Sequence, residues 1–175
     1  MARNVEIKAR VESIDAVAAR AAAIAGQGPF EFPQDDTFFT CPNGRLKLRE
    51  FSPDRGELIF YRRADKAGPK ESFYVRTVTG DPAGLRDCLT LAHGQVGRVQ
   101  KHRTLFLVGR TRLHLDRVTG LGDFLEIEVV LDDGESTDSG ISEANDVMAR
   151  LGVDSAQLVE AAYVDLMTGP TTLTR

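Results

Sequence analysis

Alternation between apolar and polar side chains predicts β-strands through most of this chain. In the first such run, residues 4–12, the apolar Val5 and its odd-numbered neighbours alternate with charged residues such as Glu6 and Lys8. Successive side chains of a strand point to opposite faces, so this strand has one apolar face and one charged face. Runs of the same kind recur as far as Leu131, which indicates that a sheet dominates the fold.

Turn sequences divide these runs into eight predicted strands. Asn43-Gly44 and the segment 52–56 supply residues that tight hairpin turns need, because asparagine and glycine tolerate a positive φ. Neighbouring strands are therefore expected to pair antiparallel. The predicted strands span residues 4–12, 35–41, 45–51, 57–63, 72–78, 99–108, 111–118 and 124–131.

Four helices are predicted around these strands. The one that follows Asp81 has clear signals at both ends, with Asp81 as N-cap, Pro82 at its first position and Gly94 at its end. The predicted helices span residues 13–26, 81–94, 141–152 and 155–167, and loops are expected at residues 27–33 and 132–140.

Strands outnumber helices and short turns join most neighbours, which together favour an α+β fold with a largely antiparallel sheet. Eight strands are enough to close into a barrel, with helices packed on its apolar outer face. We therefore predict one domain, residues 1–168, built as a closed eight-stranded antiparallel β-barrel, or tunnel, with helices outside. Residues 169–175 are expected to form a C-terminal tail.

Composition narrows the possible partners and the compartment. The net charge of −4, from 26 acidic and 22 basic residues, provides no general attraction to nucleic acid or to an anionic membrane. Cys41 and Cys88 have neither disulfide-framework nor zinc spacing, which favours a reducing compartment. With no leader sequence and no long apolar run, we expect a cytoplasmic protein without nucleic-acid or membrane partners.

The charged faces of the predicted strands segregate by sign. Cations form a row at Arg45, Lys47 and Arg49, whereas Glu126 and Glu128 form a carboxylate pair. The simplest explanation is the solvated face of a half-buried sheet. However, like charges on one face repel, so a solvated face would more simply mix the two signs. A closed barrel offers the alternative that these faces line an enclosed tunnel.

Such a tunnel has the chemistry to bind a metal-bound polyphosphate. Carboxylate oxygens that converge on one wall form a hard site suited to Mg²⁺ or Mn²⁺. Arginine and lysine on the facing walls suit a polyanion, and arginine holds phosphate oxygens with two parallel hydrogen bonds.

An ordered set of motifs supports this interpretation. "VEIKAR" near the start is followed by "GRLKLRE", "GPKES", "VQKHRTLFL", "TRLHLDRVTGLGDFLEIEVVL" and "AAYVDLM". Together they resemble the CYTH superfamily of triphosphate tunnel metalloenzymes, which contains class IV adenylyl cyclases and thiamine triphosphatases. The similarity covers about residues 3–167, and its most specific part is Asp116 followed by "GLGDFLEIE". Asn4 departs from the family's Glu-x-Glu-x-Lys signature by replacing its first glutamate, so metal affinity or metal choice is expected to differ.

The resemblance implies an enzyme that uses Mg²⁺ or Mn²⁺ on a small-molecule triphosphate. The reaction is either cyclisation of ATP to cyclic AMP and pyrophosphate, or hydrolysis of tripolyphosphate or an organic triphosphate. The implied metal ligands are Glu6, Glu126 and Glu128, and Asp116 is a weaker candidate. The implied phosphate-binding residues are Lys8, Arg45, Lys47, Arg49, Arg62, Lys101, Arg103 and Arg112. The residues expected to act in catalysis are Glu6, Lys8, Arg112 and Asp116.

Several residues keep two interpretations. Alternation does not fix the register of residues 57–63, and a slip by one residue exchanges Arg62 and Arg63. Lys70 either reaches the substrate or is solvated, and His114 either tunes a proton transfer or is a polar wall residue. Arg10 shares a predicted face with Lys8 and is held in reserve as a phosphate-binding residue. Tyr163, on a helix among apolar residues, is expected to pack rather than react.

Three hypotheses for the function stay open at this point. The first is the metal-dependent enzyme, and the second is a non-catalytic polyphosphate- or nucleotide-binding protein whose metal site is weakened by Asn4. The third is a structural barrel whose charges pair with one another. A homodimer is considered only because symmetric dimers are the commonest protein oligomers. The strands do not disclose which organic group, if any, accompanies the phosphates.

Overall fold

The computed structural model describes residues 2–63 and 68–168, which form a sheet of eight strands with helices around it. The strands are β1 (Ala2–Arg10), β2 (Gln27–Phe39), β3 (Arg45–Ser52), β4 (Arg55–Arg63), β5 (Lys70–Thr79), β6 (Gln95–Val108), β7 (Thr111–Val118) and β8 (Gly122–Leu131). The helices are α1 (Ile14–Ile24), α2 (Pro82–His93), α3 (Thr137–Arg150), the 3₁₀ turn η1 (Ser155–Gln157) and α4 (Tyr163–Thr168).

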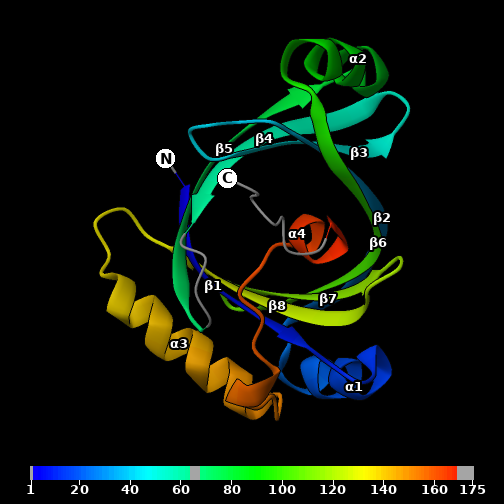
Figure 1. The fold of residues 1–175 in the computed structure, drawn as a ribbon. Helices are drawn as coiled ribbons and strands as arrows, with labels where there is room; N and C mark the ends of the chain where they lie inside the picture. Colours follow the sequence, from blue (N-terminus) through cyan, green and yellow to red (C-terminus); the bar gives the residue numbers. More distant parts are fainter. Residues whose placement is uncertain (1, 64–67, 169–175) are drawn as a thin grey trace, which may run out of the picture.

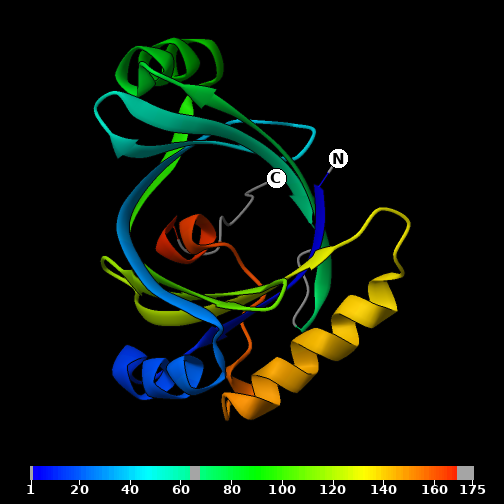
Figure 2. The same ribbon diagram turned by 180° about the vertical axis from the view of Figure 1, so that it is seen from behind.

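All eight strands pair antiparallel with a neighbour on each side, so the sheet closes into a ring (Figure 1). The order around the ring is β1-β5-β4-β3-β2-β6-β7-β8, and β8 pairs back with β1. The predicted α+β fold with a closed eight-stranded antiparallel barrel is confirmed. The ring is uneven rather than regularly round, and both ribbon views look into its opening (Figures 1 and 2).

The main apolar core lies outside the ring, between the strands and two helices. Helices α1 and α3 cover the outer face of β1, β7 and β8 in both ribbon views (Figures 1 and 2). Val5 of β1, Leu113 of β7 and Ile127 of β8 are fully buried there, against helix residues such as Ala21 and Val147. Because the apolar faces of these strands are used outside, their charged faces must point into the ring.

Residues 27–33, predicted to form a loop, instead form the first half of β2. This half pairs with β6 alone, whereas the half from Asp35 to Phe39 pairs with both β3 and β6. Pro29 and Pro33 are tolerated because a strand segment with one free side does not need every N–H for the sheet. The prolines and the glycine that suggested a loop therefore mark an edge-like stretch of strand.

The predicted helix at residues 81–94 is present as α2, with the expected signals at both ends. The Asp81 carboxylate accepts a hydrogen bond from the Gly84 backbone N–H at 2.9 Å. Pro82 occupies the first turn, where its missing N–H costs nothing. Gly94 ends the helix with φ 79°, a backbone conformation that glycine adopts without strain.

The prediction of one helix over residues 155–167 was wrong. After η1, the chain from Leu158 onward is extended: Leu158 bridges to Ala9, and the Val159 N–H donates to the Lys8 carbonyl at 2.9 Å. This pairing with β1 competes with helix formation and carries the chain to the ring. The short helix α4 then lies within the outline of the ring in both views (Figures 1 and 2).

The described helices include none that has both the length and the apolar character to cross a membrane. The predicted C-terminal tail, residues 169–175, lies outside the described residues.

Candidate functional site

The inner faces of the strands surround a cavity of about 680 Å³, a volume in the range of small-molecule binding sites. Strand register decides which charges meet there. Glu6 of β1 lies directly opposite Glu128 of β8, and Lys8 lies directly opposite Glu126. Directly opposite residues of antiparallel strands share a face, so both pairs belong to one wall of the cavity.

Most of the predicted site residues line this cavity rather than a solvated outer face. They are Glu6, Lys8, Lys47, Arg49, Lys101, Arg103, Arg112, Glu126 and Glu128. His114, for which two interpretations were open, also lines it. Three predicted site residues, Arg45, Arg62 and Asp116, are absent from this lining, and each has a different reason.

Arg62 was predicted to face the phosphates, and that placement is wrong. Its side chain is exposed on the outer face, with the guanidinium carbon 5.8 Å from the ring centre of Phe60 and 5.7 Å from that of Phe73. Arg63 takes the inward place, lines the cavity and forms an ion pair with Glu6. The β4–β5 register decides between the two, and alternation within β4 alone does not reveal it.

Arg45 lies at the end of the tunnel that α4 occupies. Its guanidinium makes two hydrogen bonds to the Asp165 carboxylate of α4, at 2.9 and 2.7 Å, and Arg45 does not line the cavity; its predicted role in phosphate binding stays a prediction. Lys70 is buried rather than solvated, and it donates to the Glu160 carbonyl at 3.0 Å. Arg10, held in reserve, is exposed and donates to a backbone carbonyl at 2.7 Å.

Asp116 is fully buried behind the cavity wall and is not among the residues that line the cavity; its predicted catalytic role stays a prediction. Its carboxylate accepts hydrogen bonds from Nε and Nη2 of Arg103 at 2.7 and 2.6 Å, and from Lys101 Nζ at 3.1 Å. The Tyr163 hydroxyl of α4 also donates to it, at 3.0 Å. We name Lys101, Arg103 and Asp116 the Asp116 cluster.

A second cluster of the same composition lies on β2 and β3. The buried Asp36 carboxylate accepts from Nε and Nη2 of Arg49 at 2.7 and 2.8 Å, and from Lys47 Nζ at 2.8 Å. Burial opposes its ionisation, but Arg49 and Lys47 hold the pKa of the Asp36 carboxyl well below its usual range. Burial, and next the repulsion of Arg49, lower the pKa of Lys47 to about 7. We name these three residues the Asp36 cluster.

Three residues of the site escaped the sequence analysis. Asp36 follows another aspartate, Asp35, and the sequence does not show which of the two side chains faces the inside of the ring. Arg63 was left as an alternative to its neighbour. Tyr163 was expected only to pack, yet its hydroxyl reaches Asp116 and its ring lies 4.0 Å from Lys8 Nζ. A complete alternation along β2 would have identified Asp36, but the prolines before it hid the first half of that strand.

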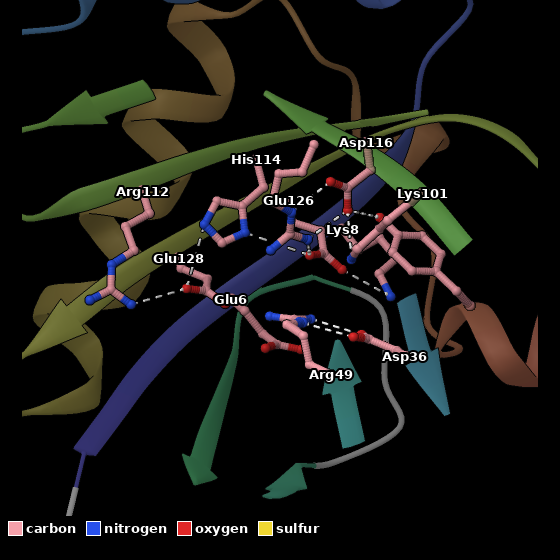
Figure 3. Close-up of polar contacts among 12 residues, drawn as sticks. Glu6, Lys8, Asp36, Arg49, Lys101, Arg112, His114, Asp116, Glu126 and Glu128 are labelled. Carbon is pink, nitrogen blue, oxygen red and sulfur yellow. Dashed lines mark hydrogen bonds and ion pairs between the residues drawn. The ribbon is translucent and has the colours of Figure 1, made fainter. Parts of the chain in front are cut away.

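The three candidate metal ligands are each paired with cations. Glu6 pairs with Arg63, and Glu128 lies 3.6 Å from Arg112. Figure 3 shows Glu126 and Glu128 side by side on the wall beneath His114. The Glu126 oxygens lie 3.3 Å from Lys8 Nζ and 2.7 Å from Arg103 Nη2.

Burial and pairing shift the ionisation of this wall. Burial would raise the pKa of Glu126, but Lys8 and other donors hold it well below its usual range. Burial lowers the pKa of Lys8 to about 8 although Glu126 partly opposes the shift. Burial, and next the charge of Arg103, lower the pKa of His114, which favours its neutral form. Glu126 is therefore ionised, and the buried Lys8 gives up a proton more easily than usual.

Whether this wall fits a divalent cation depends on its donors. Three carboxylates on two adjacent strands are hard oxygen ligands, and the buried Asn4 Oδ1 has no hydrogen-bond partner among the described residues. The described residues contain no group of three His, Cys, Asp or Glu side chains that already converges on one point. The donor set therefore fits Mg²⁺ or Mn²⁺ in chemistry and strand position, while its side chains are turned toward cations.

Comparisons with known proteins agree with this architecture. The CYTH domain family matches residues 2–163. Adenylate cyclase CyaB of Aeromonas hydrophila is 28% identical over 178 residues, which cover 97% of this chain and 91% of that protein.

Two solved structures share the fold. A Pyrococcus horikoshii protein, 24% identical, superposes with a TM-score of 0.83 over 93% of this chain and 98% of its own. A Hippeastrum protein, 16% identical and described by its structure report as having a dominant triphosphatase activity, gives a TM-score of 0.62 over 94% of both chains. With a family match over nearly its whole length and the ring of eight strands that its sequence predicts, this chain belongs to the CYTH domain family.

Proposed function

We propose that this protein is a divalent-metal-dependent enzyme that hydrolyses a triphosphate inside its tunnel. One observation carries the proposal: the same cavity is lined by the carboxylates of Glu6, Glu126 and Glu128 and by several arginine and lysine side chains. A metal-bound triphosphate needs both kinds of partner within one small volume. An internally paired structural barrel would need no cavity, yet here the charges surround about 680 Å³ of space.

The cations of the cavity account for binding and for charge neutralisation. Arg49, Arg103 and Arg112 offer guanidinium N–H donors, which match the oxygens of a phosphoryl group. Phosphoryl transfer requires little covalent help from a protein and depends mainly on positioning and on neutralising the charge of the transferred group. A tunnel wall with several fixed guanidinium groups supplies both.

Glu6, Glu126 and Glu128 are the residues that would hold Mg²⁺ or Mn²⁺, with the carbonyl oxygen of Asn4 beside them. When bound, such an ion neutralises phosphate charge and lowers the pKa of a coordinated water. The same carboxylates are now paired with Arg63, Arg103 and Arg112. Binding of a metal triphosphate would let these arginines exchange carboxylate oxygens for phosphate oxygens, so each charge keeps a partner.

ATP cyclisation is the second candidate reaction. It is favoured by the similarity to adenylate cyclase CyaB, at 28% identity over nearly the full length of both chains. Cyclisation and hydrolysis use the same anion and metal sites and differ in the attacking oxygen, which is a ribose hydroxyl in one case and water in the other. We place hydrolysis first because the tunnel requires only the triphosphate part of the substrate.

A substrate and metal panel tests the proposal. Purified protein is incubated with tripolyphosphate, ATP or thiamine triphosphate, each with Mg²⁺, Mn²⁺ or EDTA, and inorganic phosphate, pyrophosphate and cyclic AMP are measured. We expect metal-dependent phosphate release from at least one substrate. Cyclic AMP with pyrophosphate would select the second reaction.

Two other results would count against an enzyme. Tight binding of all three compounds without any product would favour the non-catalytic binding protein. Absence of thermal stabilisation by tripolyphosphate, with the Arg49→Ala variant behaving like the parent, would favour a structural barrel.

A further inference from the structure

We propose that Asp36 is a positioning residue for phosphate binding: together with Asp116 it fixes two arginines so that each presents its remaining nitrogen to the triphosphate. This inference rests on the proposed function, because it concerns how the same cavity recognises phosphate. Its basis is the repeated geometry of the Asp36 and Asp116 clusters, which come from different strands.

The two clusters match in sequence spacing and strand register. In each, a lysine precedes the arginine by two residues on one strand, and the aspartate lies on the neighbouring antiparallel strand. Asp36 lies directly opposite Arg49 in the β2–β3 register, and Asp116 lies directly opposite Arg103 in the β6–β7 register. Because β2 pairs with β6, the two clusters occupy four successive strands of the ring.

The hydrogen bonds of the two arginines also match. Both arginines use Nε and Nη2 on the aspartate oxygens, at 2.6 to 2.8 Å. Within residues 2–63 and 68–168, Nη1 of Arg49 and Nη1 of Arg103 make no hydrogen bond, and neither is a fully buried unpaired atom. Both side chains line the cavity. The free Nη1 donors are therefore available to a ligand in the cavity.

Figure 3 shows the two contacts that join the Arg49 guanidinium to the Asp36 carboxylate. A free arginine loses considerable rotamer freedom when it grips an anion, and a fixed guanidinium has already lost it. The buried aspartates thus prepare the wall before the phosphate arrives. Both aspartates are buried, and each keeps both carboxylate oxygens on its arginine and lysine partners.

Loss of Asp36 also removes a negative charge, which alone would strengthen anion binding. Near pH 6.5 this gain is offset because Lys47 loses its positive charge at the same time. Lys47 is mostly protonated there beside Asp36, since its pKa is about 7. Without its counterion the buried Lys47 gives up its proton, because Arg49 and Lys101 still repel it. The net charge of the cluster then changes little, and the loss of orientation decides the result.

A double-mutant cycle on Asp36 and Arg49 tests the proposal. Affinity for tripolyphosphate is measured by calorimetry in EDTA at pH 6.5 for the parent, Asp36→Asn, Arg49→Ala and the double variant. We expect Asp36→Asn to raise the Kd about tenfold or more, a size typical of displaced charged contacts. In the Arg49→Ala background the same change should raise the Kd by no more than about twofold, because Asp36 acts through Arg49.

Asp35 provides a matched control on the same strand. It accepts from Nε and Nη2 of Arg98 at 2.7 and 2.6 Å, the same bidentate geometry, but on the exposed side. Asp35→Asn should leave the Kd for tripolyphosphate unchanged. If it weakens binding as much as Asp36→Asn does, the effect is a general loss of structure and the proposal is wrong.

Other outcomes separate this inference from the proposed function. Parent protein that fails to bind tripolyphosphate overturns both. Parent protein that binds, with Asp36→Asn binding equally well or with equal effects in both Arg49 backgrounds, overturns the positioning role alone. Should Asp36→Asn fail to fold, Arg49→Lys replaces it in the experiment. This variant keeps the positive charge but loses the bidentate guanidinium geometry, so it should bind tripolyphosphate about tenfold more weakly. Binding as tight as that of the parent would falsify the proposal.

Discussion

The two sides of the tunnel hold their charges in different ways. On the cation side, Arg49 and Arg103 each have a buried aspartate of their own, which keeps them in place whether or not a ligand is present. On the carboxylate side, Glu126 and Glu128 are partnered by groups that themselves line the cavity, namely Lys8, Arg103, Arg112 and His114. On the proposed function, this difference means that the fold prepares the phosphate-binding arginines, whereas the carboxylates would become available to a metal only when their cations turn to the phosphates.

The largest effect is expected from Glu126→Gln. Removal of a central metal ligand should lower metal-dependent triphosphate turnover about a thousandfold, a loss comparable to deleting one preorganised electrostatic group in other active sites. Product release with Mg²⁺ and Mn²⁺ measures it. Glu71→Gln is a suitable control, because Glu71 pairs with Arg3 outside the cavity. Equal turnover in the Glu126→Gln variant and the parent would remove the carboxylate side from the mechanism.

The same variant should have the opposite effect on binding without metal. In EDTA, Glu126→Gln should bind tripolyphosphate several-fold more tightly, because Lys8 and Arg103 lose a competing carboxylate. One removed repulsion near a partly buried site amounts to about 1 kcal/mol or more. Arg103 keeps its orientation because Asp116 still holds Nε and Nη2. Asp36→Asn should weaken the same binding, so a change of the same sign in both variants would contradict the comparison.

The cation side should also show a pH dependence through Lys47. Its ammonium lies 2.8 Å from Asp36, faces the charges of Arg49 and Lys101, and lies 5.6 Å from the rings of Phe38 and Tyr61.

The pKa of Lys47, about 7, is below the value of an unfolded lysine, so the folded protein loses this proton first as pH rises. Metal-free affinity for tripolyphosphate should therefore fall several-fold between about pH 6 and pH 8.5. Lys47→Arg stays charged throughout, so its affinity should lack this fall, and the ligand's own protonation affects both proteins alike. Parallel pH profiles of the two proteins would show that Lys47 does not titrate here.

Much of the tunnel was predictable because strands have a period of two. The faces of Arg49, Lys101 and Glu126 follow from alternation inside one strand, and alternation survives in β3, β6 and β8. It fails in β4, where Ile59, Phe60 and Tyr61 are all large and apolar or aromatic. The sequence alone therefore could not show whether Arg62 or Arg63 points inward.

The partners of these charged residues could not be predicted from the sequence, because pairing depends on the register between strands that are distant in sequence. Asp116 lies opposite Arg103 only through the β6–β7 register, and no local signal distinguishes a buried counterion from a catalytic carboxylate. The extended residues after Leu158 were equally hidden, since an apolar, helix-forming composition gives no warning of a backbone bond from Val159 to Lys8. Long-range contacts decided both cases.

The smallest effect is expected from a change at Asn4. It tests whether the carboxylate side binds a metal ion without substrate when it has one more carboxylate. Asn4→Glu restores a carboxylate to a position that is buried, lines the cavity and has an unpartnered Oδ1 among the described residues. We expect Mn²⁺ affinity, measured by titration without substrate, to rise up to about tenfold, because one more charged oxygen faces the ion.

The cost of that buried charge provides the control. Without metal, Asn4→Glu should lower the free energy of unfolding by about 1 to 3 kcal/mol, and saturating Mn²⁺ should recover most of the loss. Asn4→Ala should neither raise the affinity nor show this recovery. A destabilised Asn4→Glu variant that Mn²⁺ does not rescue would mean that no cation approaches this end of β1, and that the carboxylates serve only to pair with the tunnel's arginines.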